Sequence, residues 1–176
     1  MDEPGAPPRA MVFASDHLFW VVDIGHTPAA PFAPENGLVV VTQPGAAVIF
    51  TGVHTGYVSV EVQVLDSAPE QADESGWDEV VEVSMQAPRG RVSVLGPMAY
   101  NRGVLPELTP AGPGDYRLRV HARGRDTLVD GVATEPVEDY LIVVWPAQPA
   151  TERRYKQSDG YGADLRRTAA RTRSNI

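Results

Sequence analysis

A tight turn followed by a strictly alternating run limits what this chain can fold into more than any other feature of its sequence. In the turn, Gly112-Pro113-Gly114-Asp115, proline presets φ and glycine supplies positive φ without steric strain. From residue 116 one face carries Tyr116, Leu118, Val120 and Ala122, and the other carries Arg117, Arg119, His121 and Arg123. Because successive side chains of a strand point to opposite faces, we predict a half-buried strand with a cationic stripe on its solvent side.

Three further runs have the character of strands. Residues 138–146 are more evenly apolar than the alternating run, which is typical of a more deeply buried neighbour, and end at Pro146, which cannot donate to a ladder. Residues 56–66 place four valines on one face: Val58, Val60, Val62 and Val64. Residues 77–86 also alternate, and a Pro-Arg-Gly turn leads from them into residues 91–95. We therefore expect these last two segments to form a hairpin.

The spacing of these runs predicts the fold class and the domain boundaries. Sixteen prolines and sixteen glycines, with no long helical period, favour short strands joined by turns. We predict an all-β fold, an antiparallel β-sandwich of about 7–9 short strands, with a closed barrel as the alternative. Residues 1–9 are predicted to be disordered, 10–149 to form the sandwich, and 150–176 to form a basic tail that is flexible or a short helix. Leu165 is the one large apolar residue of the helix candidate, residues 162–172, which favours a mobile tail over a docked helix.

Charge is distributed unevenly along the chain. Residues 150–176 contain seven basic and three acidic residues, about +4, so the total of −8 leaves about −12 for residues 1–149. An acidic body disfavours nucleic acid as the main partner, because phosphate neutralisation needs a clustered basic surface. It suits a basic protein partner, since opposite fields speed and orient the encounter. The alternative is that the acidic surface only keeps the protein soluble.

Cysteine content and apolar runs bear on the compartment. The chain has no cysteine, which excludes disulfides and thiolate chemistry and favours a reducing setting. Residues 1–5 lack the basic and apolar regions of a signal peptide, and no apolar run is long enough to span a membrane. We expect a cytoplasmic protein with no membrane partner.

Two of the stretches described above also resemble a known family. Residues 108–118 read Leu-Thr-Pro-Ala-Gly-Pro-Gly-Asp-Tyr-Arg-Leu, and residues 138–142 read Glu-Asp-Tyr-Leu-Ile. This order resembles the competence protein J-type domains, in which a Leu…Pro-x-Gly-Asp-Tyr-x-Leu segment precedes a closing Tyr-x-Ile strand. The strand around His17, Phe19, Val21 and Asp23 and the 77–85 strand fit the same order, so the resemblance covers roughly residues 11–147.

The resemblance implies a function. The family's named member is the cytoplasmic inhibitor of a DNA-entry nuclease, which implies a protein that binds another protein and blocks it. The arginine-rich stripe and the basic tail depart from the family and leave the identity of the partner open.

The residues that we predict for partner binding belong to the outer face of the closing strands and to the acidic loop 66–78. They are Arg117, Arg119, His121, Arg123, Asp73, Glu74 and Asp78. Guanidinium groups bind oxyanions through paired N–H donors, so the stripe can hold an acidic partner surface or a phosphate. The alternative is that the stripe forms cross-strand pairs with Glu61, Glu82 or Asp78, worth about 0.2–1 kcal/mol each.

The sequence gives little support to catalysis. Its four histidines, His17, His26, His54 and His121, lack the close pairing of a typical metal site, and adjacent Ser15-Asp16-His17 is not triad geometry. We predict a non-catalytic protein-binding or regulatory module without cofactor or metal, an inhibitor or immunity-type partner of a nuclease or another basic protein. The alternative is a small-ligand- or metal-binding β-domain enzyme that uses His54 and His121. A third possibility is a structural subunit that assembles through sheet edges. The oligomeric state stays open.

Overall fold

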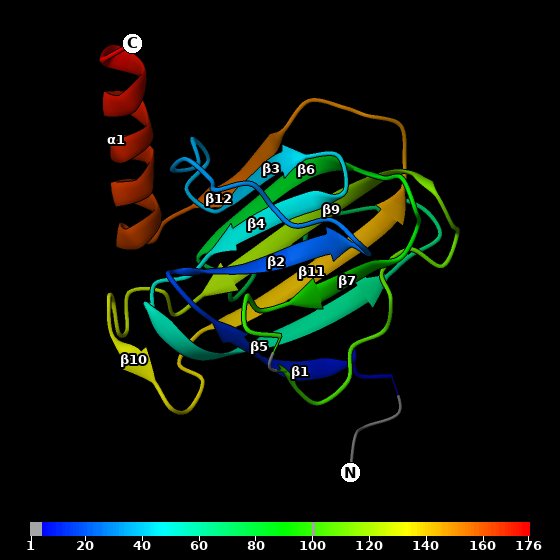
Figure 1. Ribbon diagram of the computed structural model, residues 1–176, viewed down its shortest axis with the longest axis horizontal. Coiled ribbons are helices and arrows are strands. Elements are labelled where there is room, and N and C mark those ends of the chain that lie inside the picture. The colour runs from blue at the N-terminus through cyan, green and yellow to red at the C-terminus, as the bar shows by residue number, and fades with distance from the viewer. Residues whose placement is uncertain (1–4, 100) are drawn as a thin grey trace.

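The structure is a computed structural model that describes residues 5–99 and 101–176. Its strands form two sheets that pack face to face (Figure 1). The larger sheet has the spatial order β12 (Arg153–Gln157), β6 (Glu79–Ala87), β9 (Gly114–Arg123), β11 (Asp139–Pro146), β5 (Thr55–Val64), β1 (Arg9–Ala14) and β8 (Asn101–Arg102), and β10 (Val132–Ala133) pairs with β5 beside this path. The smaller sheet has the order β3 (Val39–Gln43), β4 (Ala46–Phe50), β2 (Leu18–Asp23) and β7 (Val92–Leu95).

The predicted all-β sandwich is confirmed, with differences in detail. The described residues form twelve strands rather than seven to nine, and the larger sheet is mixed because β11 and β10 both run parallel to β5. The predicted hairpin between β6 and β7 is wrong. β6 pairs with β9 and β12, whereas β7 pairs with β2 in the other sheet. The turn between them crosses from one sheet to the other, and Asp23 holds its end by accepting a hydrogen bond from the backbone N–H of Arg91 at 2.7 Å.

The core lies between the two sheets and contains the apolar faces that the alternation of β9 and β5 predicted. Tyr116, Leu118, Val120 and Ala122 are all buried and belong to one cluster with the valines of β5. Phe19 of the smaller sheet meets Tyr140 of the larger one edge to face, with ring centroids 5.1 Å apart. Each such buried apolar side chain contributes roughly 1.5–3 kcal/mol by leaving water.

Strand direction explains why the other face of β9 is also covered. β5 runs parallel to β11, and β9 is antiparallel to both β11 and β6, so β5 and β6 run the same way. Their connection, residues 65–78, must therefore cross back along the sheet, and we call it the crossover loop. Backbone hydrogen bonds hold its two ends, from Leu65 to Val144 at 2.8 Å and from Asp78 to Ala122 at 2.9 Å. The predicted solvent-exposed stripe is therefore wrong for Arg117, which is 3% exposed, for Arg119, which is 5% exposed, and for His121, which is also buried; Arg123 is exposed.

The segment after residue 149 adds a strand and a helix to the body. β12 extends the larger sheet beyond β6, and α1 (Gly160–Ser174) follows it and stands beside the sandwich (Figure 1). Asp159 caps the helix by accepting a hydrogen bond from the Gly162 N–H at 2.7 Å. Tyr161 and Leu165 pack on Val48 and Phe50 of the smaller sheet. At the other end of the chain, the predicted disorder of residues 1–9 falls partly on residues 1–4, which lie outside the described residues, while Arg9 begins β1.

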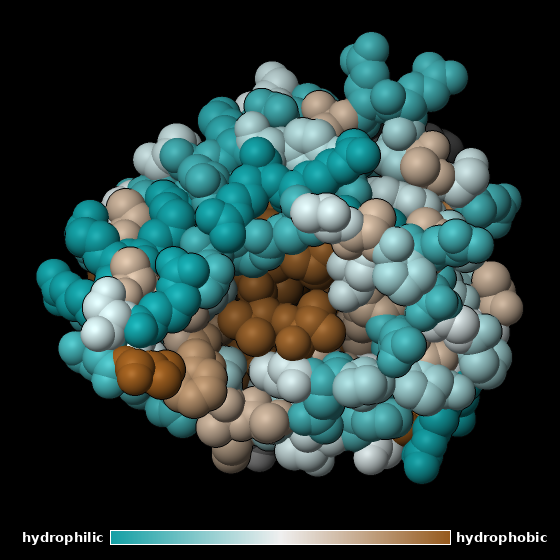
Figure 2. Space-filling model, turned by 90° about the horizontal axis from the view of Figure 1, so that it is seen from above, coloured by the Kyte–Doolittle hydropathy of each residue, from teal (hydrophilic) through white to brown (hydrophobic). Residues whose placement is uncertain are grey.

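Seen from above, the surface is hydrophilic around a central hollow of hydrophobic side chains (Figure 2). The edge strands β3 and β12 lie on this side of the molecule (Figure 1). β12 pairs only with the first half of β6, from Glu79 to Glu82, so the second half of β6 stays at the edge of its sheet. A cavity of about 380 Å³ opens there between β3 and β6, with Val41 and Met85 in its wall.

Candidate partner-binding site

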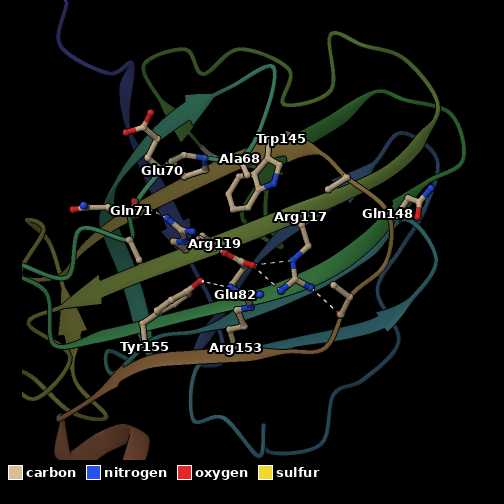
Figure 3. A pocket seen from close by; sticks show the side chains of 14 residues that line it. Ala68, Glu70, Gln71, Glu82, Arg117, Arg119, Trp145, Gln148, Arg153 and Tyr155 are labelled. Carbon is tan, nitrogen blue, oxygen red and sulfur yellow. Dashed lines mark hydrogen bonds and ion pairs between the residues drawn. The ribbon is translucent and has the colours of Figure 1, made fainter.

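The centre of the candidate site is one carboxylate that binds two arginines. In the register of the sheet Glu82 on β6 lies opposite Arg119 on β9, and Arg117 lies two residue pairs further along, on the same face. The Glu82 Oε2 accepts from Arg117 Nη2 at 2.7 Å, and its Oε1 accepts from Arg119 Nε at 3.0 Å (Figure 3). The alternative expectation of cross-strand pairing therefore holds for Glu82.

Arg117 is a fixed structural cation. Its five N–H donors make five hydrogen bonds: two to Glu82, one to the Ser84 hydroxyl, and one each to the carbonyls of Ala150 and Thr151. The last two fasten the chain between β11 and β12 across the sheet face. Because every donor is occupied, Arg117 has no N–H left for a partner.

Arg119 is held differently. Its guanidinium lies 5.1 Å from the ring centroids of both Trp145 and Tyr155, which fixes its plane by cation–π contact. Its Nε donates to Glu82 at 3.0 Å, its Nη2 forms an ion pair with the same carboxylate, and its Nη1 donates to the carbonyl of Gln71 on the crossover loop at 3.4 Å. A register shift between Arg154 and Lys156 on β12 places Tyr155 over this group.

These side chains line a pocket of about 380 Å³ (Figure 3). The sheet provides its floor, the crossover loop one wall, and residues 147–155 the other. Besides Glu82, Arg117 and Arg119, it is lined by Ala68, Pro69, Glu70, Gln71, Ala72, Trp145, Ala147, Gln148, Ala150, Arg153 and Tyr155. Figure 3 shows the Glu70 carboxylate pointing away from the arginines.

The remaining predicted basic residues lie further along β9. His121 is 2% exposed and packs against Trp77 with ring centroids 5.4 Å apart. Burial lowers the pKa of His121, so the neutral ring is favoured. Arg123 is exposed, donates to Asp139 at 2.9 Å and stacks on Trp77 at 4.6 Å. Neither residue lines the pocket, so the structure does not gather the predicted stripe into one site.

The predicted acidic residues divide into two kinds. Asp78 is structural, because its Oδ2 accepts from the Gly124 N–H at 3.0 Å at the end of the sheet. Asp73 and Glu74 lie on the crossover loop, where Asp73 accepts from the Ser75 N–H. Within residues 5–99 and 101–176 neither of these two carboxylates forms an ion pair; Asp73 is exposed and Glu74 is half-buried.

The histidines do not meet as the enzyme alternative requires. His54 lies beside His17, with ring centroids 5.1 Å apart, whereas His121 packs on Trp77. His17 Nε2 lies 2.8 Å from Asp130 Oδ1, and Tyr161 of α1 stacks on its ring at 5.7 Å. In the part of the chain that the structure describes, no group of three His, Asp or Glu residues is placed to hold a metal ion.

The sequence patterns did not predict a second charged cluster, which lies around Arg125 and Glu79. Arg125 is fully buried and binds Asp159 through two hydrogen bonds of 2.7 and 2.9 Å. Glu79 is also fully buried and accepts from Arg166 of α1 at 3.2 Å. Burial, and then the nearby Asp159 charge, raises the pKa of Glu79 to about 7. The partners are 34 to 87 residues apart, so spacing alone gave no signal.

Comparison with known proteins adds evidence on the fold. No family model matches the chain, and no curated protein matches it by sequence. Solved structures with a similar fold include ComJ, inhibitor of the DNA degrading activity of NucA, from Bacillus subtilis, with a TM-score of 0.51 and 15% identity over 84% of this chain and 99% of that one. Another is described as crocagin biosynthetic gene J, with a TM-score of 0.50 and 19% identity over 80% and 97%. At these identities the likeness establishes the fold: this chain has a ComJ-like two-sheet β architecture. No helix in the described ranges is long and apolar enough to cross a membrane.

Proposed function

We propose that this protein is a non-catalytic cytoplasmic module that binds another protein and inhibits it, and that the partner is a nuclease or another basic protein. The observation that carries the proposal is the ComJ-like fold, which extends over 84% of this chain and 99% of a neighbour described as a nuclease inhibitor. The uneven charge of the chain supports it, because a body of about −12 attracts a basic surface.

The crossover loop is the surface that we assign to the partner. Its carboxylates at Asp66, Glu70, Asp73 and Glu74 lie within nine residues on an irregular segment over the sheet face, and none of them forms an ion pair within the described part of the chain. Such uncompensated charges raise the association rate with a basic protein and orient it. Arg119 and the hydrogen-bonded ends of the loop hold this segment in place, so it is presented without a large ordering cost.

The test uses charge reversal on the loop with a matched control. Tagged wild type, the Asp73→Lys/Glu74→Lys double variant and Glu135→Lys are used to capture partners from a lysate of the native cell. Glu135 is exposed and also lacks an ion pair among the described residues, so its reversal changes charge away from the loop. We expect one protein at near-equal amount with wild type and Glu135→Lys, and its loss with the double variant. Equal capture by all three proteins would contradict the assignment of the loop.

A further inference from the structure

The pocket beside Glu82 holds more positive than negative charge. The side chains of Arg117 and Arg119 are 4% and 6% exposed, and Glu82 is the one carboxylate among the described residues that pairs with them. Arg153 adds a third guanidinium to the lining. A buried charge without a counter-charge is costly, so this arrangement favours an added anion. We propose that the pocket binds a carboxylate group carried on a short aliphatic stem.

The free donors of Arg119 match that ligand. A guanidinium has five N–H donors, and Arg119 uses two of them in hydrogen bonds, one on Glu82 and one on the carbonyl of Gln71, while its Nη2 forms an ion pair with Glu82. One N–H on each terminal nitrogen has no acceptor in the described residues. Trp145 and Tyr155 fix the plane of the group, so these N–H groups are held rigidly and can donate to the oxygens of a carboxylate.

The surroundings favour a carboxylate over a phosphate. Ala68, Pro69, Ala72 and Ala147 line the pocket and provide apolar contact for an aliphatic stem. A volume of about 380 Å³ is at the small end for ligand pockets. The acidic crossover loop forms one wall, and its negative potential repels a dianion or a polyanion more strongly than a single carboxylate.

The experiment is an NMR titration of the full chain at constant ionic strength, followed through the indole N–H signal of Trp145. The probes are propionate, the blocked peptide acetyl-Ala-Glu-Ala-amide, and inorganic phosphate. Three variants are compared with wild type: Arg119→Gln, Arg153→Gln, and Arg154→Gln as the matched control. Arg154 lies on the same strand as Arg153 but does not line the pocket, and it pairs with Glu152. Arg119→Gln leaves Arg117 and Glu82 as a neutral pair, so the variant is expected to fold.

We expect saturable binding of a carboxylate probe, at least about tenfold weaker in Arg119→Gln, a few-fold weaker in Arg153→Gln and unchanged in Arg154→Gln. Tighter binding of the peptide than of propionate would identify a peptide-borne carboxylate, and equal binding a free acid; both support the pocket. Absence of saturable binding, equal binding by wild type and Arg119→Gln, or a preference for phosphate would overturn the inference. The inference does not rest on the proposed function, whose test changes the crossover loop and reads out a captured protein.

Discussion

Glu82 is a buried carboxylate whose negative charge stabilises two buried arginines on one face of the larger sheet. It is 4% exposed and neutralises one of two buried arginines. Removing one partner of a buried ionic group is costly mainly because of the charge that is left behind. The two possible deletions therefore differ, since losing Glu82 leaves two cations whereas losing Arg119 leaves a neutral pair.

The first prediction compares these deletions. We expect Glu82→Gln to lower the free energy of unfolding by about 3–5 kcal/mol, and Arg119→Gln to lower it clearly less. Urea denaturation at pH 7 measures both. Equal losses for the two variants would show that the charge count around Glu82 does not determine stability here.

The second prediction concerns Glu79, which faces Asp159, Arg125 and Arg166. Its carboxyl group keeps its proton up to about pH 7 in the folded protein but releases it near 4.5 in the unfolded chain. The folded state therefore binds more protons between these values, and stability falls as the pH rises through them, by at most about 3 kcal/mol. Glu79→Gln should flatten this part of the stability–pH curve measured by urea denaturation. An identical slope in both proteins would contradict the assignment.

At the scale of elements, the C-terminal helix is fixed by polar contacts as well as by the apolar packing of Tyr161 and Leu165. Asp126 accepts hydrogen bonds from the N–H groups of Gly160 and Tyr161, both at 2.8 Å, at the N-terminus of α1. Asp159 caps the same turn and pairs with the buried Arg125. The helix candidate of the sequence, residues 162–172, left out Tyr161, which is buried beside Val48 and Phe50, and spacing along the chain could not indicate the distant ion pairs that also hold the helix.

The third prediction follows from this arrangement. Asp159→Ala removes the cap and leaves Arg125 buried without its carboxylate, so we expect a loss of about 3–5 kcal/mol. Asp164→Ala removes the same charge from an exposed position on the same helix, where its partner is Arg167, and should cost less than about 1 kcal/mol. Thermal unfolding and hydrogen exchange in α1 distinguish the two variants. Similar losses would mean that the Arg125–Asp159 pair does not anchor the helix.

Elements were predicted from sequence where the pattern is local. The alternation of β9 assigns Leu118 and Val120 to the core, and both lie there. It could not reveal that the opposite face is also covered, because that depends on the parallel course of β5 and β6 and on the crossover loop that this course requires. The predicted hairpin between β6 and β7 was wrong for a related reason, since adjacency along the chain does not decide which sheet a strand joins.

At the scale of the whole molecule, charge is distributed unevenly between the body and the C-terminal segment. The net charge of −8 combines an acidic body with a basic C-terminal segment, part of which is used internally: Arg166 pairs with Glu79 and Arg173 with Glu35. The crossover loop keeps its carboxylates free of ion pairs within the described part of the chain.

The fourth prediction is that partner binding weakens as salt is added, because long-range attraction between opposite charges is screened. Surface plasmon resonance with the captured partner measures this. An affinity that does not change between low and physiological salt would argue against a charge-guided interface.

The central claim is that this protein inhibits a partner through the crossover loop, and degradation of DNA tests it most directly. Purified protein is titrated into a native-cell extract or the captured partner, and the loss of intact plasmid DNA is followed over time. We predict that degradation stops near one equivalent of wild type or Glu135→Lys, and that it continues in the presence of the Asp73→Lys/Glu74→Lys variant. Undiminished degradation at a large excess of wild-type protein would contradict the nuclease-inhibitor account.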